Sequence, residues 1–244
     1  MHLRLVFLAS LISLALNAQE TEGFNTRLNA GFTLTDGNSD STLLTLGMDT
    51  KNVRENREFL ASATYKYGRT TVENNDGEDI EKTNVDSAKG KAQGNLLFSE
   101  KTYAFLNAAA ERDEIADLKY RFLGGPGIGH YLIRNDDTSL SVEAGLVYVA
   151  ESENGQEEDY PAFRAAQSFE HALSDTARLW QSLEYIPEAD DTSVYLLNAE
   201  IGAEAKLGEK LALRLVATDK YDSDPAADAE ENDLTLVAGL SYEL

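Results

Sequence analysis

The chain has 244 residues, with 43 acidic against 21 basic residues, a formal net charge of −22 and no cysteine. This composition excludes a basic surface for nucleic acid or anionic lipid, and it excludes a disulfide framework or a cysteine-linked lipid anchor. The length suits one large domain or two small ones.

The first 18 residues are typical of a secretory signal peptide. Arg4 supplies a positive charge, residues 5–16 are apolar apart from two serines, and Ala18 stands at the expected cleavage point. The apolar run is too short to span a bilayer as a helix. Its removal takes away one arginine and no acid, so the mature chain, residues 19–244, carries a formal charge of −23.

The rest of the chain alternates apolar and polar residues with a period of two, which predicts β-strands. The alternation is clearest at the end, where apolar residues occupy every second position from Leu234 to Leu244. Twelve strands are predicted, at 22–35, 41–52, 57–68, 84–98, 101–112, 118–132, 138–150, 160–172, 176–186, 192–206, 210–221 and 233–244.

The connections between these strands alternate in length. Short turns are expected at 54–57, 99–100, 134–137, 174–175 and 208–209. Mostly longer, acidic connections are expected at 70–82, 113–117, 151–159, 187–191 and 222–232, with 37–41 as a short member of this set. An even strand count with this asymmetry is typical of bacterial outer-membrane proteins. It predicts an all-β fold, a transmembrane antiparallel up-and-down β-barrel of about twelve strands, with external acidic loops.

A soluble barrel or sandwich would also alternate, with its apolar face inward. The aromatic residues favour the membrane alternative, because they gather near both ends of the strands and leave aliphatic residues in the middle. The belt near the long loops comprises Tyr65, Tyr67, Tyr120, Tyr148, Tyr160, Tyr185, Tyr195 and Tyr221. The belt near the short turns comprises Phe98, Tyr103, Phe105, Trp180 and Tyr242, although Trp180 shares the parity of charged neighbours and can point inward.

The stretch LGGPGIGHY, residues 123–131, resembles a phosphate-binding loop only superficially. A dinucleotide loop needs a third glycine and then a helix, whereas His130 and another strand follow here. In a strand, the alternate glycines face the lumen, where they leave room for side chains from other strands or let the strand bend. Pro126 predicts a bulge or a lost hydrogen bond, because proline cannot donate to the ladder.

Three stretches carry a family resemblance: GNSDSTLLTLGMD (37–49), TYAFLNAAAERDEIADLKYRF (102–122), and GGPGIGHYLI leading into LSVEAGLVY (124–148). With them the chain resembles the salt-induced outer-membrane protein family, a β-barrel domain of largely unknown function. The resemblance implies a Gram-negative outer-membrane barrel expressed under salt stress, and it supplies no catalytic motif. The final Leu244 departs from the Phe or Trp with which such barrels usually end.

The sequence predicts no enzyme and no cofactor. Some outer-membrane barrels are enzymes, among them a twelve-stranded phospholipase that uses serine and histidine. The two histidines of the mature chain, His130 and His171, fall on the apolar face near the short turns. That position favours an interfacial side chain over a general base.

Acidic residues cluster at three of the long connections. The clusters are Asp76, Glu78, Asp79 and Glu81; Glu151, Glu153, Glu157, Glu158 and Asp159; and Asp222, Asp224, Asp228, Glu230 and Glu231. Calcium takes several carboxylate oxygens, but none of the clusters has the spacing of a calcium-binding loop. Solvated, self-repelling loops are favoured and no metal site is predicted. Diffuse magnesium or calcium bridges to lipopolysaccharide need no defined site.

Charged residues of both signs share the parity opposite to the apolar face, so they are expected to line the lumen. The candidates are Lys66, Lys89, Lys91, Lys119, Arg121, Arg164, Glu170, Glu184, Glu200, Glu204 and Arg214. In a confined space such charges should pair. The expected protein is a monomer that forms a narrow ion or small-solute pore. The alternatives are a structural envelope-stress barrel without transport and, less favoured, an outer-membrane enzyme or adhesin.

Overall fold

The computed structural model describes residues 23–35, 41–73, 78–225 and 230–244. The predicted signal peptide lies outside the described residues, as do most of the first external connection, Asp76 and Asp228. Within the described residues, no helix is long and apolar enough to cross a membrane.

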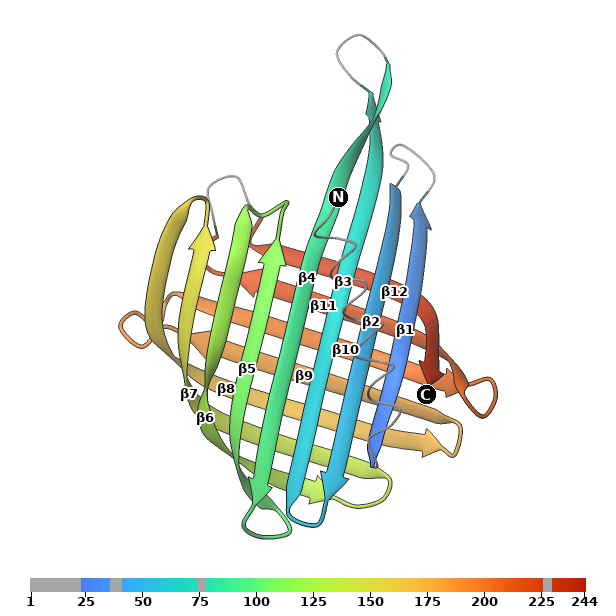
Figure 1. The fold of residues 1–244 in the computed structure, drawn as a ribbon, viewed down its shortest axis with the longest axis vertical. Helices are drawn as coiled ribbons and strands as arrows, with labels where there is room; N and C mark the ends of the chain where they lie inside the picture. The colour runs from blue at the N-terminus through green and yellow to red at the C-terminus, as the bar shows by residue number, and fades with distance from the viewer. Residues whose placement is uncertain (1–22, 36–40, 74–77, 226–229) are drawn as a thin grey trace.

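Twelve antiparallel strands close into one barrel, each strand pairing with its neighbours in sequence and the first with the last (Figure 1), which confirms the predicted fold class. The strands are β1 (Phe24–Thr35), β2 (Ser41–Arg54), β3 (Arg57–Glu73), β4 (Asp79–Leu97), β5 (Thr102–Asp113), β6 (Leu118–Arg134), β7 (Thr138–Glu153), β8 (Gln156–Ser174), β9 (Ala177–Pro187), β10 (Tyr195–Lys206), β11 (Leu211–Asp222) and β12 (Asn232–Glu243).

The apolar face of the sheet points outward. On β10, Ile201 is 59% exposed, whereas Glu204 on the opposite face is only 7% exposed. The same outward position is taken by Leu106 and Ile128 on β5 and β6, both more than half exposed. A soluble barrel would bury these side chains and expose the charges. The arrangement therefore belongs to a barrel whose wall faces lipid.

The prediction of long acidic connections at 70–82 and 151–159 is wrong, because most of these residues belong to strands. β3 and β4 stay paired as far as Glu73 and Asp79, and their hairpin rises beyond the other strands (Figure 1). β7 and β8 are joined by Asn154 and Gly155, whose φ angles of 51° and 77° fit a tight two-residue turn. The alternation of apolar and polar residues is needed only where the wall faces lipid. Backbone pairing between strands continues beyond that part, so the sequence pattern underestimates strand length.

Part of the aromatic belt prediction is also wrong. Tyr103 and Phe105 on β5 point into the barrel and are 1% and 4% exposed. Tyr160 packs inside against the buried cluster that contains Val149 and Ile186. Other members remain on the outside, such as Tyr185, Tyr195 and Tyr221, whose neighbouring rings lie 5.2 and 5.6 Å apart.

The alternate glycines of β6 explain why Tyr103 and Phe105 turn inward. Phe105 lies directly opposite Gly127, and Tyr103 directly opposite Gly129. A β-carbon on either glycine would overlap the facing ring. The glycines therefore make room for aromatic rings that cover the bare backbone.

Pro126 has the predicted local effect on the ladder. The pairing of β6 with β7 includes Gly124 with Tyr148 and then Gly127 with Gly145, and it skips Gly125 and Pro126. The register on either side of the gap is the same, so hydrogen bonding is interrupted without a bulge at this point.

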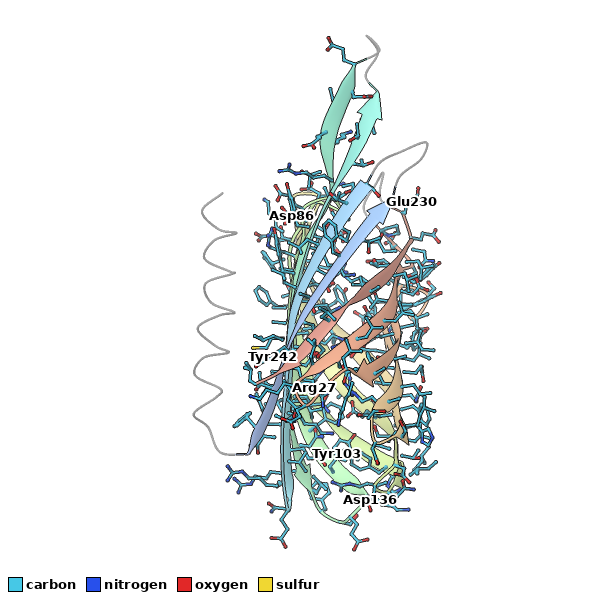
Figure 2. All side chains as sticks on the ribbon, turned by 90° about the vertical axis from the view of Figure 1, so that its right-hand side faces the viewer. Arg27, Asp86, Tyr103, Asp136, Glu230 and Tyr242 are labelled. Atoms are coloured by element: carbon cyan, nitrogen blue, oxygen red, sulfur yellow. The ribbon has the colours of Figure 1, made fainter. Side chains whose placement is uncertain are left out.

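The barrel closes over a short seam between β1 and β12. These strands pair over five residues, from Arg27 with Glu243 to Gly31 with Gly239, whereas β3 and β4 pair over seventeen. Figure 2 shows the two strands meeting near Arg27 and Tyr242 and diverging above that point. Among the described residues, the outer halves of β1 and β12 are therefore held only by β2 and β11.

Paired cysteines would test this seam, since the chain has no cysteine of its own. Leu28 and Tyr242 lie directly opposite each other, so L28C/Y242C should form a disulfide on mild oxidation in the membrane. Leu34 and Leu236 would be opposite if the ladder continued three residues beyond Gly31 and Gly239, so L34C/L236C is the matched control. We expect a shifted band on non-reducing gels for the first pair and none for the second. Equal crosslinking of both pairs would show that β1 and β12 pair along their whole length, which would contradict the short seam.

Candidate functional site

The inner wall carries an ion-paired network at its outer end, centred on Arg121 of β6. The Arg121 guanidinium contacts Glu111, Glu151, Glu153 and Asp222, with N–O distances of 3.7 Å to Glu111, 3.2 Å to Glu153 and 3.1 Å to Asp222. Arg121 itself is only 8% exposed. We call these five residues the Arg121 cluster.

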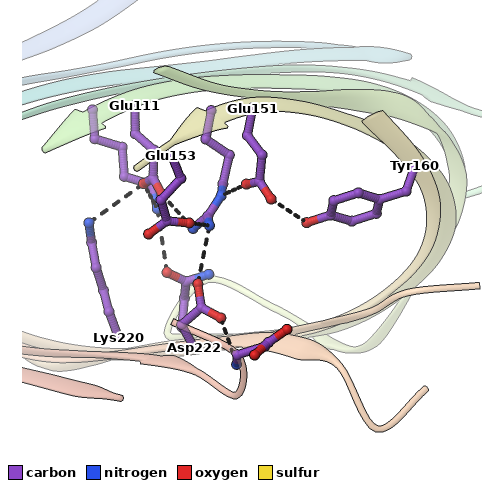
Figure 3. A network of polar contacts seen from close by, with 10 residues as sticks. Glu111, Glu151, Glu153, Tyr160, Lys220 and Asp222 are labelled. Atoms are coloured by element: carbon purple, nitrogen blue, oxygen red, sulfur yellow. Dashed lines mark hydrogen bonds and ion pairs between the residues drawn. The ribbon is translucent and has the colours of Figure 1, made fainter. Parts of the chain in front are cut away.

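The Arg121 cluster ties opposite walls of the barrel together. Glu111, Glu151 and Glu153 come from β5 and β7, whereas Asp222 ends β11 on the far side (Figure 3). Glu111 also contacts Lys89 at 2.8 Å and Lys220 at 3.6 Å. Because each carboxylate is shared or hydrogen-bonded, removal of one member leaves charges without a partner.

Three members of the Arg121 cluster correct the interpretation of the acidic clusters as solvated loops. Glu151 and Glu153 lie on the inward-facing side of β7, and Glu151 also accepts a hydrogen bond from the Tyr160 hydroxyl at 3.2 Å. Asp222 is the last residue of β11. These carboxylates are held by Arg121 because the strands extend further than the alternation suggested.

A second network crosses the lumen around Arg164 of β8. Its guanidinium bridges Glu143 and Glu184, each at 2.7 Å. Lys91 reaches the same Glu184 from β4 at 3.4 Å. Glu143 in turn accepts a hydrogen bond of 2.7 Å from the Tyr103 hydroxyl. The inward aromatic residues thus contribute to the polar network as well as filling space.

A third group lies nearer the short turns, around Trp180 of β9. Arg178 and Arg214 both form cation–π contacts with Trp180, with guanidinium carbons 4.9 and 4.8 Å from the ring centroid. The indole N–H donates to Glu200 at 2.6 Å. Arg178 also pairs with Glu170 at 2.9 Å and Glu204 at 3.1 Å, and Arg214 with Asp49 at 2.8 Å.

Two of the predicted lining residues stand apart from these networks. The Lys66 ammonium contacts the hydroxyl of Thr218, across the lumen, at 3.3 Å. Lys119 is exposed and lies at a register shift between Leu118 and Tyr120. Strand parity therefore no longer places Lys119 beside Arg121.

Sequence reasoning missed several network residues. Glu143 and Lys220 share the inward parity of Arg164 and Arg214 respectively, so the alternation could have identified both. Glu111 was harder to find, because it has the parity of Tyr103 and Phe105, which the belt prediction assigns to the outside. Glu58, which accepts hydrogen bonds from Tyr131 and Asn95, shares the inward parity of Lys66 on β3, so the alternation could have identified it too.

Two cavities lie within the part of the barrel that the structure describes. The mouth cavity, about 310 Å³, is lined by Arg121, Glu151, Glu153, Asn154, Gln156, Glu158, Tyr160, Ile186, Glu188, Val194, Tyr195, Leu196, Asp222, Asp224 and Pro225. The mid-lumen cavity, about 190 Å³, is lined by Ser62, Thr64, Lys66, Ser87, Ala88, Lys89, Lys91, Ser182, Glu184, Asn198, Ala199, Glu200, Thr218, Asp219 and Lys220. Arg121 lines the first cavity and its indirect partners, Lys89 and Lys220, line the second.

The mouth cavity has a negative electrostatic field. Glu188 lies just beyond the end of β9, and burial together with the charges of Glu151 and Glu158 raises the pKa of its carboxyl group. An apolar cluster of Val147, Val149, Ala162 and Ile186 packs beside the cavity inside the barrel. The mouth therefore combines acidic groups with a packed apolar wall.

The histidines do not assemble a catalytic arrangement with the networks. His130 lies opposite Thr102 on β5, with its Nδ1 3.0 Å from the hydroxyl, and His171 lies opposite Thr138 on β7 at 2.9 Å. Both are outside the charged clusters described above. Among the described residues, no group of three or more histidines and carboxylates is placed to hold a metal ion.

Comparison with solved structures agrees with the barrel fold. The NanC porin superposes with a TM-score of 0.53 at 7% identity, covering 90% of this chain and all of the porin chain. Further matches include the KdgM porin (TM-score 0.45, 10% identity, 89% and 98% covered) and the translocator domain of the autotransporter NalP from Neisseria meningitidis (TM-score 0.44, 16% identity, 97% and 94% covered). At these identities the likeness concerns the fold alone.

The sequence matches no curated protein. It does match the family model described as a protein of unknown function, DUF481, over residues 28–244, which is nearly the whole barrel. The chain therefore belongs to the DUF481 family of proteins of unknown function.

Proposed function

We propose that the protein is a narrow pore for ions and small solutes in the bacterial outer membrane. The observation that carries the proposal is the contrast between the two faces of the wall. Charged and hydroxyl side chains line two cavities on the inside, while the outside is apolar. A purely structural barrel needs only a packed interior. Charged groups at this density are useful where ions or polar solutes enter.

Pairs that cross the lumen make the proposed pore narrow. Arg121 to Asp222 joins β6 with β11, and Lys91 to Glu184 joins β4 with β9. A twelve-stranded barrel is intermediate between barrels filled by their own side chains and wide porins, so the lining decides what passes. Here the lining restricts passage to water and small ions.

A second candidate function is an envelope-stress barrel without transport, expressed at raised salt. The apolar cluster around Val149 and Ile186, together with the cross-lumen pairs, supports this alternative because both close the interior. We do not propose an enzyme or an adhesin. The proposed protein is a monomer whose partners are outer-membrane lipid and lipopolysaccharide, with divalent cations bridging diffusely at the acidic outer hairpins.

Location can be tested by fractionation. Since the exposed wall is apolar, the folded protein should be recovered with outer membranes and should migrate faster on gels before boiling than after it. Recovery as a soluble periplasmic protein would contradict the proposed location.

Conductance tests the pore. Purified protein in a planar bilayer should show small, weakly selective currents, because charges of both signs line the lumen at similar numbers. The variant K89S/K91S/R121S should conduct more and favour cations, since Glu170, Glu200 and Glu204 remain. The double variant K89S/K91S keeps Arg121 and should change in the same direction by less. Variant R69S/K82S, on the outer part of the β3–β4 hairpin, is the control and should not change.

Large currents from the unmodified protein would contradict the cross-lumen pairs. An absence of current from both the unmodified protein and the folded triple variant would favour the structural alternative.

A further inference from the structure

The mid-lumen cavity gathers an unusual share of the positive charge of the chain. Four of the ten lysines line it: Lys66 from β3, Lys89 and Lys91 from β4, and Lys220 from β11. The whole chain carries twice as many acidic as basic residues. A chance distribution of charge would therefore place more carboxylates than lysines around an interior cavity, whereas four lysines and three carboxylates line this one.

The carboxylates that contact these lysines are too few to balance them. Lys89 and Lys220 share the single carboxylate of Glu111, which also faces Arg121. Lys91 shares Glu184 with Arg164, and Arg164 is the closer of the two, at 2.7 Å against 3.4 Å.

Lys66 and the other acidic residues of the cavity do not change this excess of positive charge over paired carboxylates. The contact described for the Lys66 ammonium is the neutral hydroxyl of Thr218. Glu200 accepts the indole N–H of Trp180, and Asp219 lines the cavity but forms no ion pair among the described residues. Asp113 and Asp233 favour the charged form of Lys66 electrostatically, but neither forms an ion pair with it among the described residues. A half-buried ammonium group without a paired carboxylate is costly, so the cavity favours an anion.

Neutral donors surround the lysines. The hydroxyl groups of Ser62, Thr64, Ser87, Ser182 and Thr218 line the same cavity. An oxyanion has several acceptor oxygens, and charge-assisted bonds from ammonium groups are roughly twice as strong as neutral ones. Hydroxyl groups would complete the shell of such an anion without adding charge.

We propose that the mid-lumen cavity is a binding site for a small soluble oxyanion such as inorganic phosphate, sulfate or a short carboxylate. Lys66, Lys89 and Lys91 approach from the neighbouring strands β3 and β4, and Lys220 approaches from β11 on the other side of the lumen. The volume of about 190 Å³ suits one small anion with its waters and excludes an oligomeric acid. This inference rests on the proposed pore function, because the anion must enter the lumen from solvent to reach the cavity.

Calorimetric titration of the folded protein with inorganic phosphate, in lipid-free detergent, tests the site. We expect saturable binding by the unmodified protein and at least a tenfold weaker affinity in K66Q/K220Q. Variant K66R keeps the charge and should bind close to normally. Variant K206Q/K210Q removes two exposed lysines outside the cavity and should bind as the unmodified protein does. Faster migration before boiling shows that each variant is folded.

The two proposals can fail separately. Phosphate binding without conductance would support the anion site and contradict the pore. Conductance without binding of phosphate, sulfate or acetate would support the pore and overturn the anion site, as would equal phosphate affinity in folded K66Q/K220Q. Because the titration contains no lipid, binding of free phosphate also separates a soluble oxyanion from a lipid headgroup.

Discussion

The whole structure depends on one constraint: within lipid, no water satisfies backbone N–H and C=O groups, so a spanning sheet must pair every strand and close. Closure reverses the usual arrangement of side chains. Apolar residues such as Leu106 and Ile128 face out, and charged residues must occupy the inside. The short seam between β1 and β12 is where this constraint is met least completely, because pairing stops at Gly31 and Gly239.

Once charges are confined to the lumen, they must be paired there. Desolvation makes an unpaired buried charge costly, and this cost selects contacts that cross the barrel. Arg121 gathers carboxylates from β5, β7 and β11, and Arg164 bridges carboxylates of β7 and β9. Glycine and aromatic residues fill the interior in a similar way on β5 and β6. There the rings of Tyr103 and Phe105 on β5 cover the backbone of the glycines on β6. The interior is therefore specified by complementarity between strands that are distant in sequence.

The period of two was sufficient to predict the strand count, the closed antiparallel order and most strand ends. Alternation also groups Arg164 with Glu184, which the structure joins in an ion pair. It could not show which partner each charge would choose, since Arg121 and Asp222 are 101 residues apart. A bulge cancels parity, as at Lys119, and aromatic residues near a strand end fit either face, as Tyr103 and Phe105 demonstrate. Outside lipid the alternation fades, so the strand extensions that carry Glu151 and Glu153 have no sequence signal.

The central claim is that ion pairs between opposite walls close the lumen, and a double-mutant cycle between Arg121 and Asp222 tests it most directly. The free energy of unfolding would be measured in lipid vesicles for the unmodified protein, R121Q, D222N and the double variant. Direct contact predicts a coupling energy of about 0.5–3 kcal/mol. The exposed pair of Arg69 and Glu81 on one hairpin serves as reference and should couple by less than about 1 kcal/mol. Additive effects of R121Q and D222N, within about 0.3–0.5 kcal/mol, would contradict a lumen held closed by these charges.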